Sequence, residues 1–408
     1  MNPVVVIPSY WTWQDEPLEI GRVGAYDHAT PIAKPLPELE SCLSSLEGVR
    51  GVLRVVVLLV APRSCAEGAR ARVDAICRAH PRLNPLVVDQ READLVTRAI
   101  ESIAPKMDRE SVSLRGYGAI RNMGLAVAAI LGHDVVVFMD DDEVALDEDF
   151  LIDALFGLGL ANRQGLPIVA KSGHFLDRSD SPYADVSKPH WRDRHWAKRV
   201  EFNQWMHRAQ AGTRISRSNY VCGGCFTVAA QAFCSVAFDP AIPRGEDLDY
   251  LFDLRMHGLD VWFDNQWRVR HLPPECPSRA ARFLQDAYRW EYEVAKLRFA
   301  NSSIGLHQVR PESLRPYPSE WVSPEVSRRI ALTSLLRAIA GPERGAYLGI
   351  FLRGRHKAKA WAERYCSSYF GFQTYWPKIM GTLWQDSLLA RRIVSSGTPA
   401  KQGGGAHA

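Results

Sequence analysis

Four short apolar runs, alternating with segments of helical spacing, constrain the fold of this chain most. The runs are Val4–Ile7, Leu53–Val60, Pro85–Val88 and Asp134–Met139, and the helical segments are Glu38–Leu46, Ala66–Ala79 and Arg121–Leu131. Runs that are apolar throughout and rich in β-branched residues are typical of strands buried on both faces, as in parallel sheets with helices on both sides. The pattern predicts an α/β fold with a Rossmann-like, mostly parallel sheet.

In such sheets ligands bind beyond the carboxyl ends of the strands. We therefore expect functional residues directly after Ile7, Val60, Val88 and Met139. The first strand is expected to stop at Pro8-Ser9.

The remaining chain has a different texture. Residues 1–275 are expected to form one α/β domain, with an irregular insertion or substrate-side loop region at 176–218 that is rich in Trp, His and Arg. A helical region is expected at 276–396, followed by a Gly/Ala-rich disordered tail at 397–408. Its helices are predicted at Ser278–Ala300, Pro324–Ala340, Tyr347–Tyr365 and Tyr375–Val394.

Composition narrows the possible partners. The net charge of +4 over 408 residues does not indicate nucleic acid. No apolar run reaches the roughly 18 residues of a membrane span, and the N-terminus predicts a strand rather than a signal peptide. Eight scattered cysteines indicate a reduced, cytoplasmic setting. Cys222 and Cys225 form one close pair, which is more typical of a glycine turn than of a zinc site.

Asp140-Asp141-Asp142-Glu143 follows the fourth run directly. Acidic turns are common, but this one lies where an open sheet places its site. Carboxylates one residue apart can point toward one cation, and Mg²⁺ or Mn²⁺ held there can bridge a diphosphate. We therefore favour a metal and diphosphate site over a solvated acidic turn.

Three further segments can belong to this site. Gly116–Gly124 contains Arg121, which could contact a phosphate, and Asn122, which could cap the helix or orient the acids; a flexible capped loop is the alternative. The second segment is Arg244–Tyr250, in which Asp247 with Glu246 could act as a general base, or both acids could only stabilise a helix N-terminus. The third segment is Arg268–Pro274, in which His271 could complete the metal shell and Arg270 could bind the diphosphate.

The order of these motifs resembles the GT-A glycosyltransferases, most closely family two, with some likeness to mannosyl- and glucosylglycerate-forming enzymes. The resemblance covers about residues 3–275 and rests on five motifs, which are Ile7–Tyr10, Arg121–Gly124, Phe138–Asp142, Gly223-Gly224 and Gly245–Asp247.

The resemblance implies a role for each motif. In the DXD motif, Asp140 would bind the donor ribose and Asp142 the metal, with Asp141 between them. His271 would be a further metal ligand, and Asp247 the base of an inverting reaction. The nucleotide sugar would also contact a wider set, namely Pro8, Ser9, Tyr10, Arg121, Asn122, Gly223 and Gly224. Asp140 would in addition reach the metal.

The chain departs from the family pattern at the second strand, where Ala61–Ser64 lacks the usual uracil-binding acid. Asp89 could supply part of that function, so a UDP- or a GDP-sugar remains open. The aromatic segment Tyr10–Trp13 could stack on the base or pack against the core. The histidine ligand is better known from retaining enzymes, so both stereochemical outcomes remain open, with inversion favoured by the Glu-Asp pair.

The acceptor side is less defined. His190, Trp191, Trp196 and Trp205 could face a sugar or simply pack. Basic residues outnumber acids by thirteen to five between residues 320 and 401, which suits an anionic membrane surface, although a dimerisation or lid region is the favoured interpretation. The acceptor could be carbohydrate, small and polar, or lipid-linked. A nucleotidyltransferase and an inactive GT-A scaffold serving as a binding module are the rival hypotheses.

Overall fold

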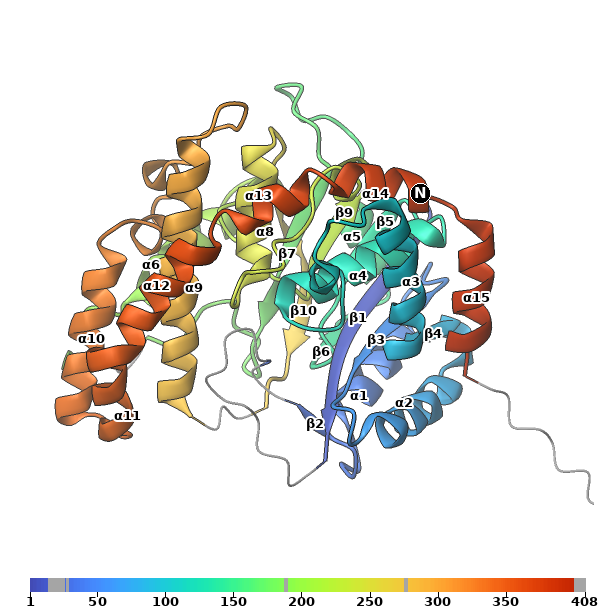
Figure 1. The fold of residues 1–408 in the computed structure, drawn as a ribbon, viewed down its shortest axis with the longest axis horizontal. Coiled ribbons are helices and arrows are strands. Elements are labelled where there is room, and N and C mark those ends of the chain that lie inside the picture. Colours follow the sequence, from blue (N-terminus) through green and yellow to red (C-terminus); the bar gives the residue numbers. More distant parts are fainter. Residues whose placement is uncertain (14–25, 27–28, 187–189, 275–277, 400–408) are drawn as a thin grey trace, which may run out of the picture.

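The computed structural model describes residues 1–13, 26, 29–186, 190–274 and 278–399. Its described strands form one mixed sheet in the order β4-β3-β1-β5-β9-β7-β10-β6, with β2 beside β1 and β8 beside β10 (Figure 1). The strands are β1 (Pro3–Thr12), β2 (Thr30–Pro31), β3 (Val55–Val60), β4 (Pro85–Val88), β5 (Val135–Phe138), β6 (Glu143–Ala145), β7 (Ala170–Leu176), β8 (Ile215–Arg217), β9 (Phe226–Ala229) and β10 (Trp262–His271).

The first half of the sheet is parallel and the second half is mixed. β4, β3, β1 and β5 run parallel, whereas β9 is antiparallel to both β5 and β7. β10 runs parallel to β7 and antiparallel to β6 and β8. The predicted α/β fold with a mostly parallel sheet is confirmed.

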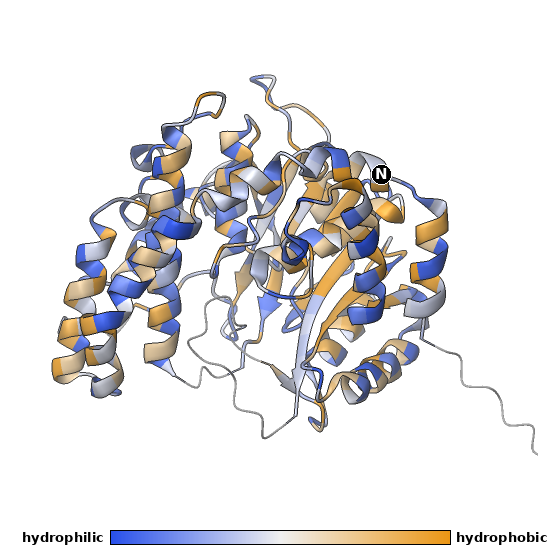
Figure 2. Cartoon of the chain, in the orientation of Figure 1, coloured by the Kyte–Doolittle hydropathy of each residue, from blue (hydrophilic) through white to orange (hydrophobic). Residues whose placement is uncertain are grey.

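Successive strand residues pack on opposite faces of the sheet, as a side-chain period of two requires. On β1, Val4 and Val6 join one hydrophobic cluster, while Val5 and Ile7 join the other. The strands accordingly form an apolar layer between helices (Figure 2). The helices of residues 1–274 are α1 (Glu38–Leu46), α2 (Ala66–Ala79), α3 (Gln90–Ile103), α4 (Tyr117–Ile130), α5 (Phe150–Leu155), α6 (Lys198–Gln210), α7 (Ala230–Phe233) and α8 (Glu246–Met256).

The first strand extends further than predicted. β1 continues through Pro8 to Thr12. Its pairing with β5 ends at Val6, opposite Phe138, while its pairing with β3 continues. Beyond Val6 the edge of β1 on the side of β5 is unpaired. Pro8, which has no N–H group, therefore fits in the strand.

Helix α4 begins before the predicted start at Arg121, with Gly116 as its N-cap at φ 78°. A Cβ on Gly118 would lie 1.9 Å from the Asp239 carbonyl oxygen. These glycines therefore let α4 start in a left-handed turn and pack tightly against the loop at Asp239.

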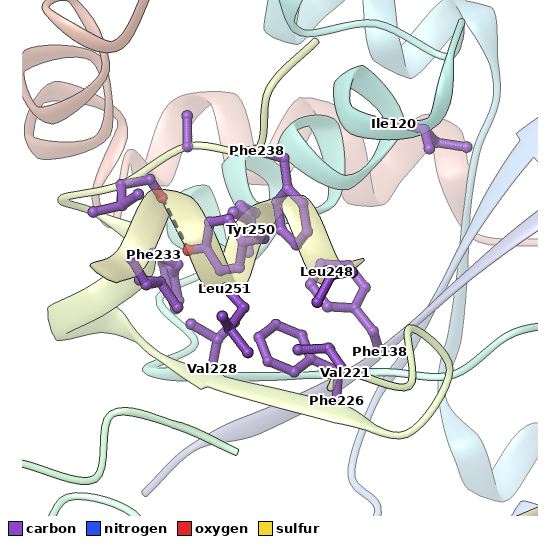
Figure 3. Packing of buried hydrophobic residues seen from close by; sticks show 14 of the residues in the cluster. Ile120, Phe138, Val221, Phe226, Val228, Phe233, Phe238, Leu248, Tyr250 and Leu251 are labelled. Carbon is purple, nitrogen blue, oxygen red and sulfur yellow. Dashed lines mark hydrogen bonds between the residues drawn. The ribbon is translucent and has the colours of Figure 1, made fainter. Parts of the chain in front are cut away.

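The central helix α8 lies over β9 and β5 (Figure 3). Tyr250 stacks on Phe238 with ring centroids 3.9 Å apart and meets Phe226 edge-on. Its hydroxyl donates to the Val236 carbonyl oxygen at 3.0 Å. This buried contact fixes the helix whose first turn carries Glu246 and Asp247.

The expectation of an irregular insertion at 176–218 is wrong in part, because this segment contains α6 and β8. Trp205 is buried, and Trp196 packs edge-on against Phe283 and Trp321. Trp205 therefore belongs to the core and Trp196 is partly buried against it, whereas Trp191 is 52% exposed.

The C-terminal region is helical, as predicted. Its helices are α9 (Arg279–Asn301), α10 (Val326–Ala340), α11 (Arg344–Gly349), α12 (Arg355–Tyr365), α13 (Ser368–Gln373), α14 (Trp376–Leu383) and α15 (Ser387–Gly397), with a π-helical turn, Ile350–Gly354, joining α11 to α12. The predicted helix Tyr375–Val394 is interrupted between α14 and α15, where Gln385 has φ 57°.

The last helices return to the sheet domain, where α15 lies beside α3 (Figure 1). Trp376 and Ile393 belong to the same hydrophobic cluster as Val4, so the helical region has no separate core. Of the predicted tail, Gly397 ends α15, and residues 400–408 lie outside the described part. No helix in that part is both long and apolar enough to cross a bilayer.

Candidate active site

The four acids that follow β5 have four different environments. The Asp140 carboxylate is the most accessible, with 38% of its side chain exposed, and it accepts a hydrogen bond from Arg121 Nη2 at 2.8 Å. Asp141 accepts from the Ser9 hydroxyl, Asp142 contacts His271, and Glu143 is buried beneath the turn. Burial raises the pKa of Asp141 well above its usual range, and the charge of Asp142 adds to this effect.

The pairing of β6 with β10 brings Asp142 and His271 together. In that antiparallel pair His271 lies opposite Glu143, and the Leu272 amide donates to the Asp142 carbonyl oxygen at 2.8 Å. As a result, His271 Nε2 lies 3.2 Å from Asp142 Oδ2, although 129 residues separate them. The Asp142 side chain is 3% exposed and the His271 ring 29%.

A carboxylate oxygen and an imidazole nitrogen fit a divalent cation such as Mn²⁺. Among the described residues, no group of three or more His, Cys, Asp or Glu side chains could hold a metal. Asp140, which was predicted as a further ligand, is engaged by Arg121 instead. A cation at this position would take one ligand from each of Asp142 and His271.

Arg121 links the acidic motif to α8. Its Nε donates to Glu246 Oε1 at 3.1 Å and its Nη2 to Asp140. Although burial opposes its charge, these two carboxylates raise the pKa of Arg121. Burial raises the pKa of Glu246 to about 7, against the opposing effect of Arg121. Arg121 and Glu246 are both buried, so this ion pair contacts little solvent and holds the residues around it in position.

Asp247 lies at the open side of this link, with 25% of its side chain exposed. Gly223 separates it from Arg121, because a Cβ on Gly223 would lie 3.1 Å from Arg121 Nη2 and 3.4 Å from the Asp247 Cβ. Arg289 on α9 approaches Asp247 Oδ1 to 4.0 Å. Sequence reasoning missed Arg289, because no local pattern on a long helix distinguishes it.

Gly224 is required by Glu143. A Cβ at position 224 would lie 1.9 Å from Glu143 Oε2. The Glu143 carboxylate also lies 3.5 Å from the Asp140 amide. The glycine pair therefore has two separate purposes: Gly223 faces the site and Gly224 accommodates a buried acid below it.

The residues in the last part of β1 divide between core and cavity. Ser9 is buried and accepts a hydrogen bond from Trp11 Nε1 at 2.7 Å, and Trp11 itself is buried, so it packs in the core rather than stacking on a base. Tyr10 lines a cavity of about 1490 Å³ formed by the end of β1, the loop after β3, the start of α3 and the segment before α4. Trp361 of α12 lines the same cavity.

Two other predicted residues have structural partners. Asp89 lines the cavity but also caps α3, accepting from the Arg91 amide at 2.7 Å and from Arg70 Nη1 at 2.9 Å. Asn122 is buried within α4 and exchanges hydrogen bonds with the backbone of Phe238. It therefore neither caps the helix nor orients the acids, contrary to the prediction.

Arg270 lies apart from the acids. Neighbouring residues of a strand face opposite sides of the sheet, so Arg270 and His271 diverge. Arg270 pairs with Asp180 instead. The expected contact of Arg270 with a diphosphate has no support in this geometry.

The mostly parallel sheet, covered by helices, is of the GT-A type found in nucleotide-sugar-dependent transferases. Residues 54–292 match the family model described as glycosyltransferase like family 2. The match spans more than half of the chain, so the chain belongs to this family and is a glycosyltransferase. No curated protein sequence matches it.

A comparison with solved structures gives three matches of low sequence identity. The mannosyltransferase PcManGT from Pyrobaculum calidifontis, in complex with GDP-Man and Mn²⁺, is 14% identical, with a TM-score of 0.46 over 94% of this chain and 87% of that one. Glucosyl-3-phosphoglycerate synthase from Mycobacterium tuberculosis, with Mn²⁺ and UDP-glucose, is 13% identical, with a TM-score of 0.33 over 70% and 74%. GalNAc-T7 with UDP, GalNAc and Mn²⁺ is 11% identical, with a TM-score of 0.40 over 92% and 58%.

Proposed function

We propose that the protein transfers a hexose from a UDP- or GDP-sugar to an acceptor hydroxyl, in a reaction that depends on Mn²⁺ or Mg²⁺ and inverts the anomeric centre. The contact of His271 with Asp142 is the observation that carries this proposal, and Asp140, two residues earlier, is linked through Arg121 to Glu246. The donor nucleoside fits the cavity at Tyr10, and its diphosphate points toward Asp142.

Each residue has a defined task in this reaction. Asp142 and His271 would hold the cation, which supplies positive charge that offsets the diphosphate as the sugar leaves. Arg121 and Glu246 keep Asp140 and Asp247 at a fixed separation across Gly223. Asp247 accepts the proton of the acceptor hydroxyl while the hydroxyl oxygen attacks the anomeric carbon. The bond between that carbon and the donor phosphate breaks at the same time.

The first experiment tests the cation site through nucleotide binding. Thermal stabilisation by UDP and by GDP is measured with and without Mn²⁺ for the wild type, Asp142→Asn and His271→Ala. We expect both variants to lose at least about tenfold in Mn²⁺-dependent nucleotide affinity, because each removes one ligand. Arg270→Ala is the matched control, since it changes the neighbouring strand residue that pairs with Asp180.

Equal Mn²⁺ dependence in all three variants would refute the site. Whichever of UDP and GDP stabilises the protein more strongly identifies the nucleotide of the donor. Because the assay requires no acceptor, it also separates an active enzyme from a scaffold that binds no nucleotide.

The second experiment tests the role of Asp247 as the general base. Asp247→Asn keeps the size of the side chain but cannot accept the proton, so transfer should slow by about 10²–10⁴-fold. Donor affinity should change little, since Asp247 lies on the acceptor side of Gly223. NMR of the product gives the anomeric configuration. Near-normal turnover with retention of configuration would instead support a retaining enzyme in which Asp247 only positions the acceptor.

A further inference from the structure

One segment of the helical region has a one-sided charge. From Arg344 to Ala362 the chain contains five basic residues and no acid. The segment comprises α11, the π-helical turn and the first part of α12. Glu343, just before it, is turned toward the start of α9, where it accepts from the Arg279 amide at 3.0 Å and from the Ser278 hydroxyl. Its charge is therefore used within the fold.

The same segment exposes aliphatic side chains. Leu348 is 47% exposed and Leu352 57%, and their spacing of four places them on one helical face. Ile339, at the end of the neighbouring helix α10, is 58% exposed. Single exposed leucines are ordinary, but here three lie on two adjacent helix ends. Apolar residues are visible along α10 and α11 in Figure 2.

A cleft lies along the basic side of this face. It has a volume of about 450 Å³ and separates the segment from Leu284 and Tyr288 of α9. Arg353 and Lys357, one turn apart and both exposed, line it. A Cβ on Gly349 at the cleft would meet no atom within 4 Å, so the space is open rather than filled by packing.

We propose that this face, defined as Ile339, Leu348, Leu352, Arg353 and Lys357, binds the surface of an anionic lipid bilayer. The leucines insert at the level of the headgroups, and the two cations contact lipid phosphates, an arrangement typical of helices that lie in a membrane interface. Charge complementarity selects this partner over a second copy of the chain, because the corresponding face of a second copy would carry the same uncompensated positive charge.

The position of the face suits an enzyme that acts at such a surface. In the view of Figure 1 the connection between α10 and α11 lies at the same lower end of the molecule as β2, which marks the carboxyl end of β1. Helix α12 also lines the large cavity through Trp361. In this view the face and the carboxyl end of β1 therefore lie toward the same end of the molecule.

The experiment measures co-sedimentation of the full chain with phosphatidylcholine vesicles, with and without phosphatidylglycerol. We expect binding only with phosphatidylglycerol, and its release at about 1 M salt, where screening acts within about 3 Å. The variant Arg353→Glu/Lys357→Glu should bind at least about tenfold more weakly. Leu348→Gln/Leu352→Gln should weaken binding by a similar factor.

Helix α15 offers matched controls, since its Leu388 is 61% exposed and Arg391 and Arg392 are also exposed. Leu388→Gln and Arg391→Glu/Arg392→Glu should bind vesicles like the wild type. Equal losses in face and control variants, or equal binding to neutral vesicles, would overturn the proposal. So would a concentration-dependent dimer that only the face variants abolish. Donor hydrolysis should stay at the wild-type rate in all variants, and vesicle binding requires no donor, so the two proposals can fail separately.

Discussion

Consecutive carboxylates behave differently when the backbone turns beneath them. Asp140 and Asp142 have cationic or metal-compatible neighbours, whereas Asp141 and Glu143 are turned inward. Burial raises the pKa of Glu143 well above its usual range, which reduces repulsion within the run. Asp140 and Asp142 are therefore the acids with a guanidinium or imidazole partner, while Asp141 and Glu143 form hydrogen bonds beneath the turn.

The contact between Gly224 and Glu143 gives a prediction at this scale. Gly224→Ala would place a methyl group 1.9 Å from Glu143 Oε2, and the enclosed carboxylate has little room to move. We expect the free energy of unfolding to fall by about 1–3 kcal/mol, as for overpacked cores. Transfer activity should fall as well, because Asp140 and Asp142 move with the turn.

Urea denaturation measures this change. Gly381→Ala on α14 is the control, since a Cβ there meets no atom within 4 Å, and alanine favours a helix. An unfolding free energy for Gly224→Ala equal to that of the wild type would show that the turn adapts.

At the scale of elements, α9 holds α8 in place. Lys296 Nζ on α9 lies 2.8 Å from Asp249, 2.7 Å from Asp253 and 2.9 Å from Asp239, and all four side chains are fully buried. The pKa of Lys296 is well above its usual value because these carboxylates outweigh the effect of burial. One cation therefore connects α9 to the helix that presents Asp247.

Replacing this cation should be severe. Lys296→Met leaves three buried carboxylates without their partner, so we expect a loss of about 3–5 kcal/mol in unfolding free energy. Arg298→Met, an exposed change two residues along the same helix, should stay within about 0.5 kcal/mol. Guanidinium denaturation of both variants checks this, and equal stability would mean that the carboxylates are accommodated without the lysine.

At the scale of the whole molecule, one hydrophobic cluster extends from β1 to α15, so distant segments unfold together. His174, on β7 in the second half of the sheet, is buried against Phe263 with ring centroids 5.8 Å apart. Burial, helped by the charge of Arg268, lowers its pKa from 6.5 to about 4. Protonation of this ring is therefore linked to global unfolding.

The sign of that linkage is defined. Below pH 6.5 the unfolded chain binds a proton at His174 that the native chain does not bind, so this contribution is complete above pH 6.5 and is lost as the pH falls toward 4. It amounts to about 3 kcal/mol at most. His174→Gln should remove this part of the pH dependence of the unfolding free energy.

Gln210→Ala is the control, because it removes the side chain 3.2 Å from the ring but keeps the titrating group. It should retain the pH dependence of the wild type. The same slope between pH 6.5 and 4 in His174→Gln as in the wild type would contradict the assignment.

The sequence by itself determined the local elements and their order. The β-branched runs became β3, β4 and β5, and the acids follow β5 as predicted, because strand propensity and burial are encoded over a few neighbouring residues. The family motifs could be placed for the same reason. Boundaries were less certain, as the extra residues of β1 and α4 show.

Only the tertiary structure decided which side chains meet. The sequence did not show that Arg121 links Asp140 to Glu246 or that Arg270 pairs with Asp180. The register of β6 against β10 brings His271 to Asp142. A strand register changes by one residue without any change in local pattern, yet it reverses which face each side chain occupies. Long-range partners therefore depend on packing that no single stretch of sequence specifies.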